Sequence, residues 1–235
     1  MGEIGLCEKG ETGFWSVIKH TNEKPSQLSG GFLLSSVKCI SVTLQDMFNM
    51  NQEENPWKTL SSKFIYDNPW IQLTEFDVVN PGGGLGIYGK VHFKNRAVGV
   101  MVLDAQNNTY LVGQYRYTLD EYSWEIPEGG GPIGLDPLDS AKRELLEETG
   151  LVANHWELLL EMHLSNSVSD ELAILYLATE LTQLEPEPEE TEQLQIIKLP
   201  FDEAYQLVMD GKIKDSMSVA AIQKTKLLFL EGKLK

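Results

Sequence analysis

Residues 129–151, GGGPIGLDPLDSAKRELLEETGL, carry the strongest structural signals in this 235-residue chain. It predicts a helix over residues 137–149, because Asp136 suits an N-cap and Pro137 suits the first helical position. Gly150 follows as the residue that ends such a helix in a left-handed conformation. The glycines before the helix leave room for backbone and ligand to approach each other closely.

Three glutamates of this helix, Glu144, Glu147 and Glu148, share one helical face because they lie at positions i, i+3 and i+4. We call them the glutamate ridge. At a separation of about 5.5 Å, each pair of charges repels by roughly 3 kcal/mol at an effective dielectric of 20. Either the ridge is a solvated surface or a cation lies over it. Hard oxygen ligands in this number suit Mg²⁺ or Mn²⁺.

The charge balance argues against a long nucleic acid as partner. The formal net charge is −16, and the chain has only three arginines, Arg96, Arg116 and Arg143. A protein that neutralises many phosphates of a polymer needs a basic face, and none is visible in the sequence. An acidic protein can still bind phosphate compounds when a metal supplies the positive charge.

The cysteines and the apolar segments indicate the cell compartment. Cys7 and Cys39 have no neighbouring metal-type ligands, so neither a disulfide framework nor a zinc site is predicted. The most apolar early stretch, residues 30–44, is broken by Lys38 and is too short to span a bilayer. It also begins too late for a secretory signal. The sequence therefore predicts a cytoplasmic protein without a membrane partner.

The rest of the chain mixes strand and helix patterns. From residue 63, alternating apolar and polar residues predict a hairpin that turns at PGGGLG, residues 81–86. Further strands are predicted in AVGVMVLD, TYLVGQYRY, HWELLLEMHL, ELAILYLATEL and QLQIIKLP, and further helices in FDEAYQLVMDG and at about residues 216–230. Because strands and helices do not alternate strictly, we predict an α/β fold with a mixed β-sheet sandwiched between helices, preceded by an N-terminal antiparallel strand region.

The N-terminal segment differs from the remainder. Residues 1–49 show no sustained period, which predicts a poorly ordered leader or upstream extension, with translation starting at Met47 or Met50. A functional N-terminal arm is the alternative. Residues 50–235 are predicted to form one domain, with N-terminal strands at 63–94 and a core at 95–235.

The stretch around the glutamate ridge resembles the Nudix box, G-x5-E-x7-R-E-U-x-E-E-x-G-U, where U is a bulky aliphatic residue. The matching positions are Gly129, Arg143, Glu144, Leu145, Glu147, Glu148, Gly150 and Leu151. One position departs, since the first box glutamate falls on Leu135. In the family that glutamate pairs with the box arginine, so Arg143 needs another partner, and Asp136 is the neighbouring candidate. The resemblance implies a Nudix fold, a metal on the glutamate ridge, and structural roles for Gly129, Arg143 and Gly150.

The resemblance runs from about residue 55 to residue 226 and looks like the ADP-ribose pyrophosphatase and nucleoside-diphosphate-sugar branch. VGQYRYTLDEYSWEIPEGG is similar to the stretch where that branch has a phosphate-binding arginine, here Arg116, and a metal-binding backbone carbonyl, here that of Glu128. SNSVSDELAILYLA places Glu171 where the branch has a glutamate that contacts sugar or water. A structural salt bridge is the alternative for Arg116, and a solvated strand start is the alternative for Glu171.

EPEPEETEQLQIIKL, residues 185–199, resembles a loop of that branch that carries a Glu-x-Glu pair. In the resembling enzymes one glutamate is the general base, here Glu190, and the other completes the metal shell, here Glu192. Glu189 is the alternative to Glu190, because a proline-spaced acidic run does not align to a single residue.

Three more side chains are candidates for substrate contacts. Trp70 and Trp124 lie in segments that flank the cleft in similar proteins, and either could stack on a nucleobase. Packing in the core is the alternative for both. Arg96 precedes a predicted strand and could also reach the substrate.

The resemblance implies metal-dependent hydrolysis of the diphosphate linkage in a nucleoside-diphosphate sugar, with ADP-ribose favoured and Mg²⁺, or Mn²⁺, as cofactor. Glu148 and Glu190 are the predicted catalytic residues, and Glu190 would take a proton from a metal-activated water. GDP-mannose or another nucleotide sugar is the alternative substrate, and a Nudix-fold protein that binds without cutting is the alternative class. Resembling enzymes are commonly homodimers, and the strands of residues 63–94 are consistent with one.

Overall fold

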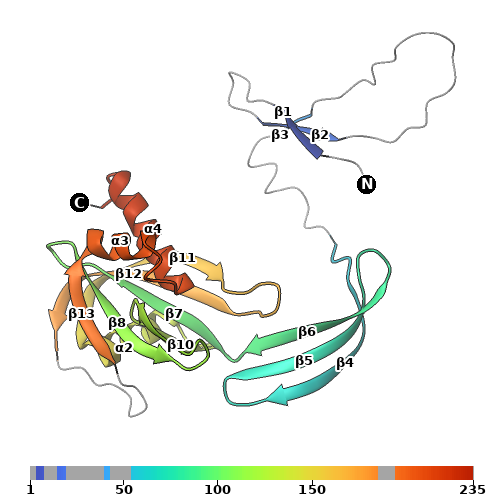
Figure 1. Ribbon diagram of the computed structural model, residues 1–235, viewed down its shortest axis with the longest axis horizontal. Coiled ribbons are helices and arrows are strands. Elements are labelled where there is room, and N and C mark those ends of the chain that lie inside the picture. Colours follow the sequence, from blue (N-terminus) through green and yellow to red (C-terminus); the bar gives the residue numbers. More distant parts are fainter. Residues whose placement is uncertain (1–3, 8–14, 20–39, 43–53, 185–193, 235) are drawn as a thin grey trace, which may run out of the picture. The chain divides into compact units, whose positions relative to one another are not determined.

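The structure is a computed structural model, and it forms two compact units, Met1–Pro56 and Trp57–Lys235. It describes residues 4–7, 15–19, 40–42, 54–184 and 194–234 (Figure 1). In the first unit, β1 (Ile4–Cys7), β2 (Trp15–Lys19) and β3 (Ile40–Val42) form a three-stranded antiparallel sheet. The predicted start at Met47 or Met50 lies outside the described residues, and the predicted leader stays a prediction.

The second unit begins with a three-stranded antiparallel sheet, β4-β5-β6. Its strands are β4 (Lys58–Asp67), β5 (Ile71–Val79) and β6 (Leu85–Phe93). The predicted hairpin at PGGGLG joins β5 to β6, where the Asn80 side chain accepts hydrogen bonds from the backbone N–H groups of Gly82 and Gly84. The predicted antiparallel strand region is therefore confirmed, and its first strand starts earlier than residue 63.

The core contains two further sheets. The four-stranded sheet has the order β10-β7-β12-β11, with β12 parallel to β7 and the other pairs antiparallel. Its strands are β7 (Asn95–Val102), β10 (Glu128–Pro132), β11 (Leu151–His163) and β12 (Leu172–Gln183). The three-stranded antiparallel sheet has the order β13-β8-β9, with β8 (Asn108–Arg116), β9 (Glu121–Glu125) and β13 (Gln195–Pro200).

Three helices cover these sheets: α2 (Pro137–Thr149), α3 (Phe201–Met209) and α4 (Ser216–Leu230). Alternate residues of β7 point to opposite faces. Val98 and Val100 pack in one buried cluster with Leu145 of α2, whereas Met101 packs in another with Ile222 of α4. Figure 1 shows α3 and α4 next to each other on one side. The two faces of β7 therefore pack against different helices, as a sheet with two apolar faces requires. The predicted mixed sheet between helices is confirmed.

Two strands of the core were not predicted from the sequence. β9 lies in EYSWE and β10 in EGGGP, a run whose glycines disfavour a strand. β10 forms by antiparallel pairing with β7, and its glycines suit the tight fit against α2, since a Cβ on Gly131 would lie 3.1 Å from Ser140 Oγ. Among the residues that the structure describes, no helix is both long and apolar enough to cross a membrane.

Candidate active site

The start and the end of α2 fix the glutamate ridge in place. The Asp136 carboxylate accepts a hydrogen bond from Leu138 N at 3.0 Å, and Pro137 occupies the first helical position. Gly150 has a φ of 69° and donates its N–H to Leu146 O at 2.8 Å. The predicted N-cap, helix bounds and left-handed C-terminal glycine are all confirmed. These caps satisfy backbone groups that the helix itself leaves unpaired.

The glutamate ridge faces the glycine strand β10. Glu148 is 3% exposed, and its carboxylate accepts a hydrogen bond from Glu128 N at 2.9 Å. A Cβ on Gly129 would lie 2.2 Å from Cδ of Glu144, so this carboxyl group occupies the space that any larger residue would need. The ridge is thus held against backbone, and a fully solvated surface is excluded for Glu144 and Glu148.

Arg143 provides the positive charge beside this ridge. Its guanidinium lies 2.6 Å from Glu147 Oε2 and 2.6 Å from Glu144 Oε1, and it donates to Gly130 O at 2.9 Å. Burial opposes the charge of Arg143, but the two glutamates raise its pKa. The expectation that Asp136 would pair with Arg143 is wrong, because Asp136 caps the helix while the guanidinium binds the adjacent Glu144 and Glu147, one turn further along α2.

A pocket of about 700 Å³ opens beside the ridge. Its walls combine β10, the start and middle of α2, Trp70, which directly precedes β5, and Asn95, the first residue of β7. Trp70 is 66% exposed, so its indole is accessible to a ligand, and its stacking role stays a prediction. Trp124 instead packs against the buried cluster of Met101 and contacts Tyr122 edge to face, which fits the alternative of core packing.

A second acidic cluster lies next to the ridge and consists of Glu125, Glu128 and Asp215. One carboxylate oxygen from each lies within 4.8 Å of the others. Arg116 Nε donates to both oxygens of Glu125 at 3.0 Å, and Arg116 Nη2 lies 2.8 Å from Glu128 Oε1. Glu125 is 3% exposed, so this pairing offsets the cost of burying its charge.

The side chain of Glu128 has an unusual environment. Burial, followed by the charges of Asp215 and Glu125, raises its pKa well above the ordinary value. Its Oε2 atom is buried and has no hydrogen-bond partner among the described residues. The sequence-based expectation was that only the backbone carbonyl of Glu128 would matter. The structure differs, because the side chain points into the second acidic cluster and binds Arg116.

The remaining predicted residues are spread over other elements. Arg96 is half-buried on β7, in register with Gly131 of β10. Glu171 precedes β12, is half-buried, and has a pKa raised by burial. Neither lines the pocket beside α2. Glu189, Glu190 and Glu192 lie outside the described residues, so their roles stay predictions.

Sequence reasoning did not single out Glu125, Asp215 or Asn95 as site residues. Glu125 stood within the quoted stretch SWEIPEGG, next to the residues that resemble the family motif. Asp215 is the N-cap of α4, where it accepts a hydrogen bond from Ser218 N at 2.7 Å. That capping pattern could have located Asp215 on the helix start. No sequence signal could have placed it beside Glu125.

The donor set fits a hard divalent cation. Carboxylates of the glutamate ridge and of the second acidic cluster surround the backbone of Glu128 and Gly129, and the two arginines do not balance their charge. The buried Glu128 Oε2 atom is an oxygen donor without a partner among the described residues. Oxygen donors of this kind are the ligands that Mg²⁺ and Mn²⁺ prefer.

Comparisons with known proteins agree with this geometry. Residues 93–218 match the NUDIX domain, and the chain belongs to the NUDIX family. Residues 57–91, which contain β4–β6, match the nucleoside diphosphate sugar hydrolase N-terminal domain. The fold resembles a crystal structure of an ADP compounds hydrolase, with a TM-score of 0.69 and 19% sequence identity over 78% of this chain and 100% of that chain.

Several relatives with known names each match about 70% of the chain. An ADP-ribose pyrophosphatase of Mycobacterium tuberculosis (strain ATCC 25618 / H37Rv) is 34% identical over 72% of this chain and 83% of its own length. One of Bacillus subtilis (strain 168) is 30% identical over 71% of this chain and 90% of its own. A methanol dehydrogenase activator of Bacillus methanolicus is 34% identical over 71% of this chain and 90% of its own. The predicted family is confirmed.

Proposed function

We propose that this protein hydrolyses the diphosphate linkage of a nucleoside-diphosphate sugar, with ADP-ribose as the favoured substrate, in a reaction that depends on Mg²⁺ or Mn²⁺. The products are a nucleoside monophosphate and a sugar phosphate. The proposal rests on the carboxylates of Glu144 and Glu148, which are fixed against the backbone of Gly129 and Glu128. Glu144, Gly129 and Glu128 line the 700 Å³ pocket, and Glu148 is buried behind them. Such preorganised oxygen donors suit a metal that binds a diphosphate.

The glutamate ridge and the backbone carbonyl of Glu128 are the groups that would hold the metal. When bound, the metal supplies positive charge to the diphosphate oxygens and lowers the pKa of a bound water. Glu148 is held by the hydrogen bond from Glu128 N, so its carboxylate keeps one orientation. Arg143 holds Glu144 and Glu147 in the same way. We infer that Glu190 accepts the proton of the attacking water and that Glu192 completes the metal shell.

Arg116 has two roles in this proposal. It positions the second acidic cluster through Glu125 and Glu128. Its side chain is also 35% exposed, so it is partly open to solvent and can contact a substrate phosphate. Its hydrogen bonds to Glu125 raise its pKa although burial opposes the charge, so it stays positively charged.

The substrate class is supported by the N-terminal match and by the relatives' names. The exposed Trp70 offers a flat apolar face in the pocket wall, on which an adenine or guanine ring can stack. Arg96 and Glu171 are candidates for contacts with the sugar end of the substrate. Two relatives are named ADP-ribose pyrophosphatase, which makes ADP-ribose the first compound to test.

Purified protein incubated with Mg²⁺ and a panel of nucleotide sugars, including ADP-ribose and GDP-mannose, tests the proposal directly. We expect release of a nucleoside monophosphate that stops when the metal is chelated. Binding of a nucleotide sugar without any release would instead support the alternative of a non-catalytic Nudix-fold protein. No binding and no release across the panel would contradict the proposed function.

We also propose that two copies associate through the sheet β4-β5-β6. Its outer strands expose large apolar side chains, among them Phe64 at 72%, Leu85 at 80% and Ile87 at 69%. An apolar surface of this kind usually marks a contact with another protein. Light scattering on the purified chain tests this, and a mass equal to that of one chain at all concentrations would contradict it.

A further inference from the structure

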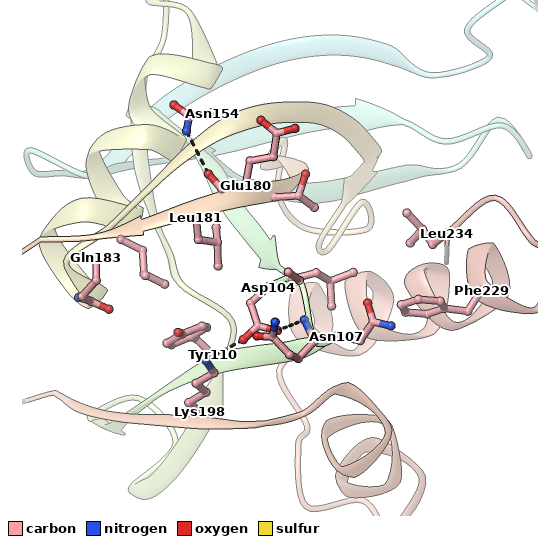
Figure 2. A pocket seen from close by; sticks show the side chains of 15 residues that line it. Asp104, Asn107, Tyr110, Asn154, Glu180, Leu181, Gln183, Lys198, Phe229 and Leu234 are labelled. Carbon is pink, nitrogen blue, oxygen red and sulfur yellow. Dashed lines mark hydrogen bonds and ion pairs between the residues drawn. The ribbon is translucent and has the colours of Figure 1, made fainter.

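A second hollow lies away from the pocket beside α2. It has a volume of about 710 Å³ and is formed by the β7–β8 turn, the paired ends of β11 and β12, β13 and the C-terminal end of α4. Figure 2 shows Asn154 and Glu180 on one side of it, with Asp104, Asn107 and Tyr110 on the other. It shares no lining residue with the pocket beside α2, and its volume falls in the range of small-molecule pockets.

The charges of this hollow disfavour an anion. Lys198 is the only cationic side chain that lines it among the described residues, and its Nζ atom lies 2.7 Å from Asp104 Oδ2. Asp104 is only 11% exposed, and hydrogen bonds from Lys198 and Asn108 lower its pKa although burial would raise it. Asp104 therefore neutralises Lys198, and Glu180 leaves the lining with a formal charge of −1.

The remaining polar groups are suited to hydroxyl groups. Gln106, Asn154 and Gln183 contribute amides, which can both donate and accept, and Glu180 contributes a carboxylate acceptor. Gln183 donates through Nε2 to the carbonyls of Thr149 and Leu184, which leaves its amide oxygen as an acceptor for a ligand. The lining therefore holds planar polar groups that form pairs of hydrogen bonds with neighbouring hydroxyls.

Aromatic rings complete the hollow. Tyr110 contributes a half-buried ring from β8, whose face lies 5.4 Å from Lys198 Nζ, and Phe229 contributes a half-buried ring from α4. Flat apolar surfaces of this type pack against the C–H face of a sugar or against a nucleobase. Polar groups and rings together favour a ligand that is both hydroxylated and cyclic.

We propose that this hollow is a binding site for an uncharged, hydroxyl-rich ring compound, a free sugar or a nucleoside, that is separate from the nucleotide-sugar site beside α2. Glu180 and the amides bind its hydroxyls, while Tyr110 and Phe229 cover its apolar face. A phosphorylated form binds less well, because the one lysine is already paired and the lining carries net negative charge.

Calorimetric titration of the full-length chain with ribose, ribose 5-phosphate, adenosine and AMP, in metal-free buffer, tests the site. Comparing ribose with adenosine shows whether the ligand is a free sugar or a nucleoside. Asn154→Trp places an indole at the rim of the hollow. His155→Trp is the matched control, because His155 is the next residue of β11, has a side chain 51% exposed, and does not line the hollow.

We expect ribose or adenosine to bind more tightly than its phosphate. Asn154→Trp should weaken that binding by about tenfold or more, equivalent to 1.4 kcal/mol, and His155→Trp should leave it unchanged. Both variants should keep the nucleotide-sugar hydrolysis of the unmodified chain, since neither residue belongs to the site beside α2. Absence of binding by both uncharged compounds, equal binding by both variants, or tighter binding of a phosphate that Asn154→Trp also weakens would each overturn the proposal.

Discussion

The glutamate ridge and the second acidic cluster are two acidic groups that the chain builds in different ways. The ridge comes from one helix, and Arg143 of the same helix accompanies it. The second acidic cluster takes Glu125 from β9, Glu128 from β10 and Asp215 from the cap of α4, and Arg116 of β8 accompanies it. Helical spacing alone brings the first group together, whereas the second exists only after the sheets have formed.

The two groups also differ in what their arginines achieve. Arg143 is 42% exposed and lines the pocket together with Glu144, one of the two glutamates that it binds. Arg116 binds Glu125, which is almost completely buried. We infer that the ridge serves chemistry and that the second cluster mainly serves the stability of the metal-binding backbone. The following predictions test this division.

The largest expected effect is on the ridge. Glu148→Gln should lower turnover by about 10³-fold, because it removes the negative charge of a fixed oxygen ligand for the metal. This decrease corresponds to roughly 4 kcal/mol of lost transition-state stabilisation. Steady-state kinetics with ADP-ribose and Mg²⁺ measure it. Glu157→Gln, an exposed glutamate of β11, is the control and should leave turnover unchanged. A Glu148→Gln protein that retains most of its metal-dependent activity would show that the ridge is not the reaction centre.

The glycine strand offers a second test of the ridge. Gly129→Ala places a methyl group where Glu144 has its carboxyl group, so this flexible side chain must move. We expect turnover to fall by about 10²-fold, or roughly 2.7 kcal/mol, with little loss of stability. Gly86→Ala is the control, because a Cβ there meets nothing within 4 Å. Equal activities of the two variants would contradict the assigned position of Glu144.

A substitution in the second acidic cluster should mainly lower the free energy of unfolding. Arg116→Met leaves the buried Glu125 carboxylate without its cation, and we expect a loss of about 2 kcal/mol in unfolding free energy, reduced by the partial exposure of the guanidinium. Chemical denaturation measures this loss, with Lys63→Met on the exposed strand β4 as control. A rise in KM without loss of stability would instead show that Arg116 acts only on the substrate.

The smallest expected change is a loss of stability at Asp170, an acidic residue outside both clusters. Burial would raise the pKa of Asp170, but hydrogen bonds from Lys90 and His92 lower it to about 2. A lowered pKa in the folded state stabilises the protein above the ordinary value of 3.8, and this contribution disappears as the pH falls from about 4 through 2.

Asp170→Asn should therefore cost about 1 kcal/mol at pH 7, because the carboxylate is one-third exposed and screened by solvent. Denaturation at several pH values measures the difference, which should vanish near pH 2. Asp139→Asn, at a site 77% exposed, is the control. A difference that persists unchanged at low pH would assign the effect to packing and not to charge.

Much of the fold was predictable where local signals were strong. The bounds of α2, its cap at Asp136 and its end at Gly150 follow from residue types that favour those positions. The hairpin of β5 and β6 and the strands of the core follow from apolar periodicity. β10 could not be predicted, because its glycines carry no strand signal. It forms by pairing with β7, and glycines suit its close contact with α2.

The family, the helix with its glutamate ridge, and the residue types suited to a divalent metal could all be predicted, because they depend on spacing along one short segment. The packed fold was needed to show that Arg116 pairs with Glu125, that the Glu128 side chain is buried beside Asp215, and that Trp70 and not Trp124 borders the pocket. Those relations join segments far apart in the chain. Their distances are set by how the sheets pack, which no local pattern of residues records.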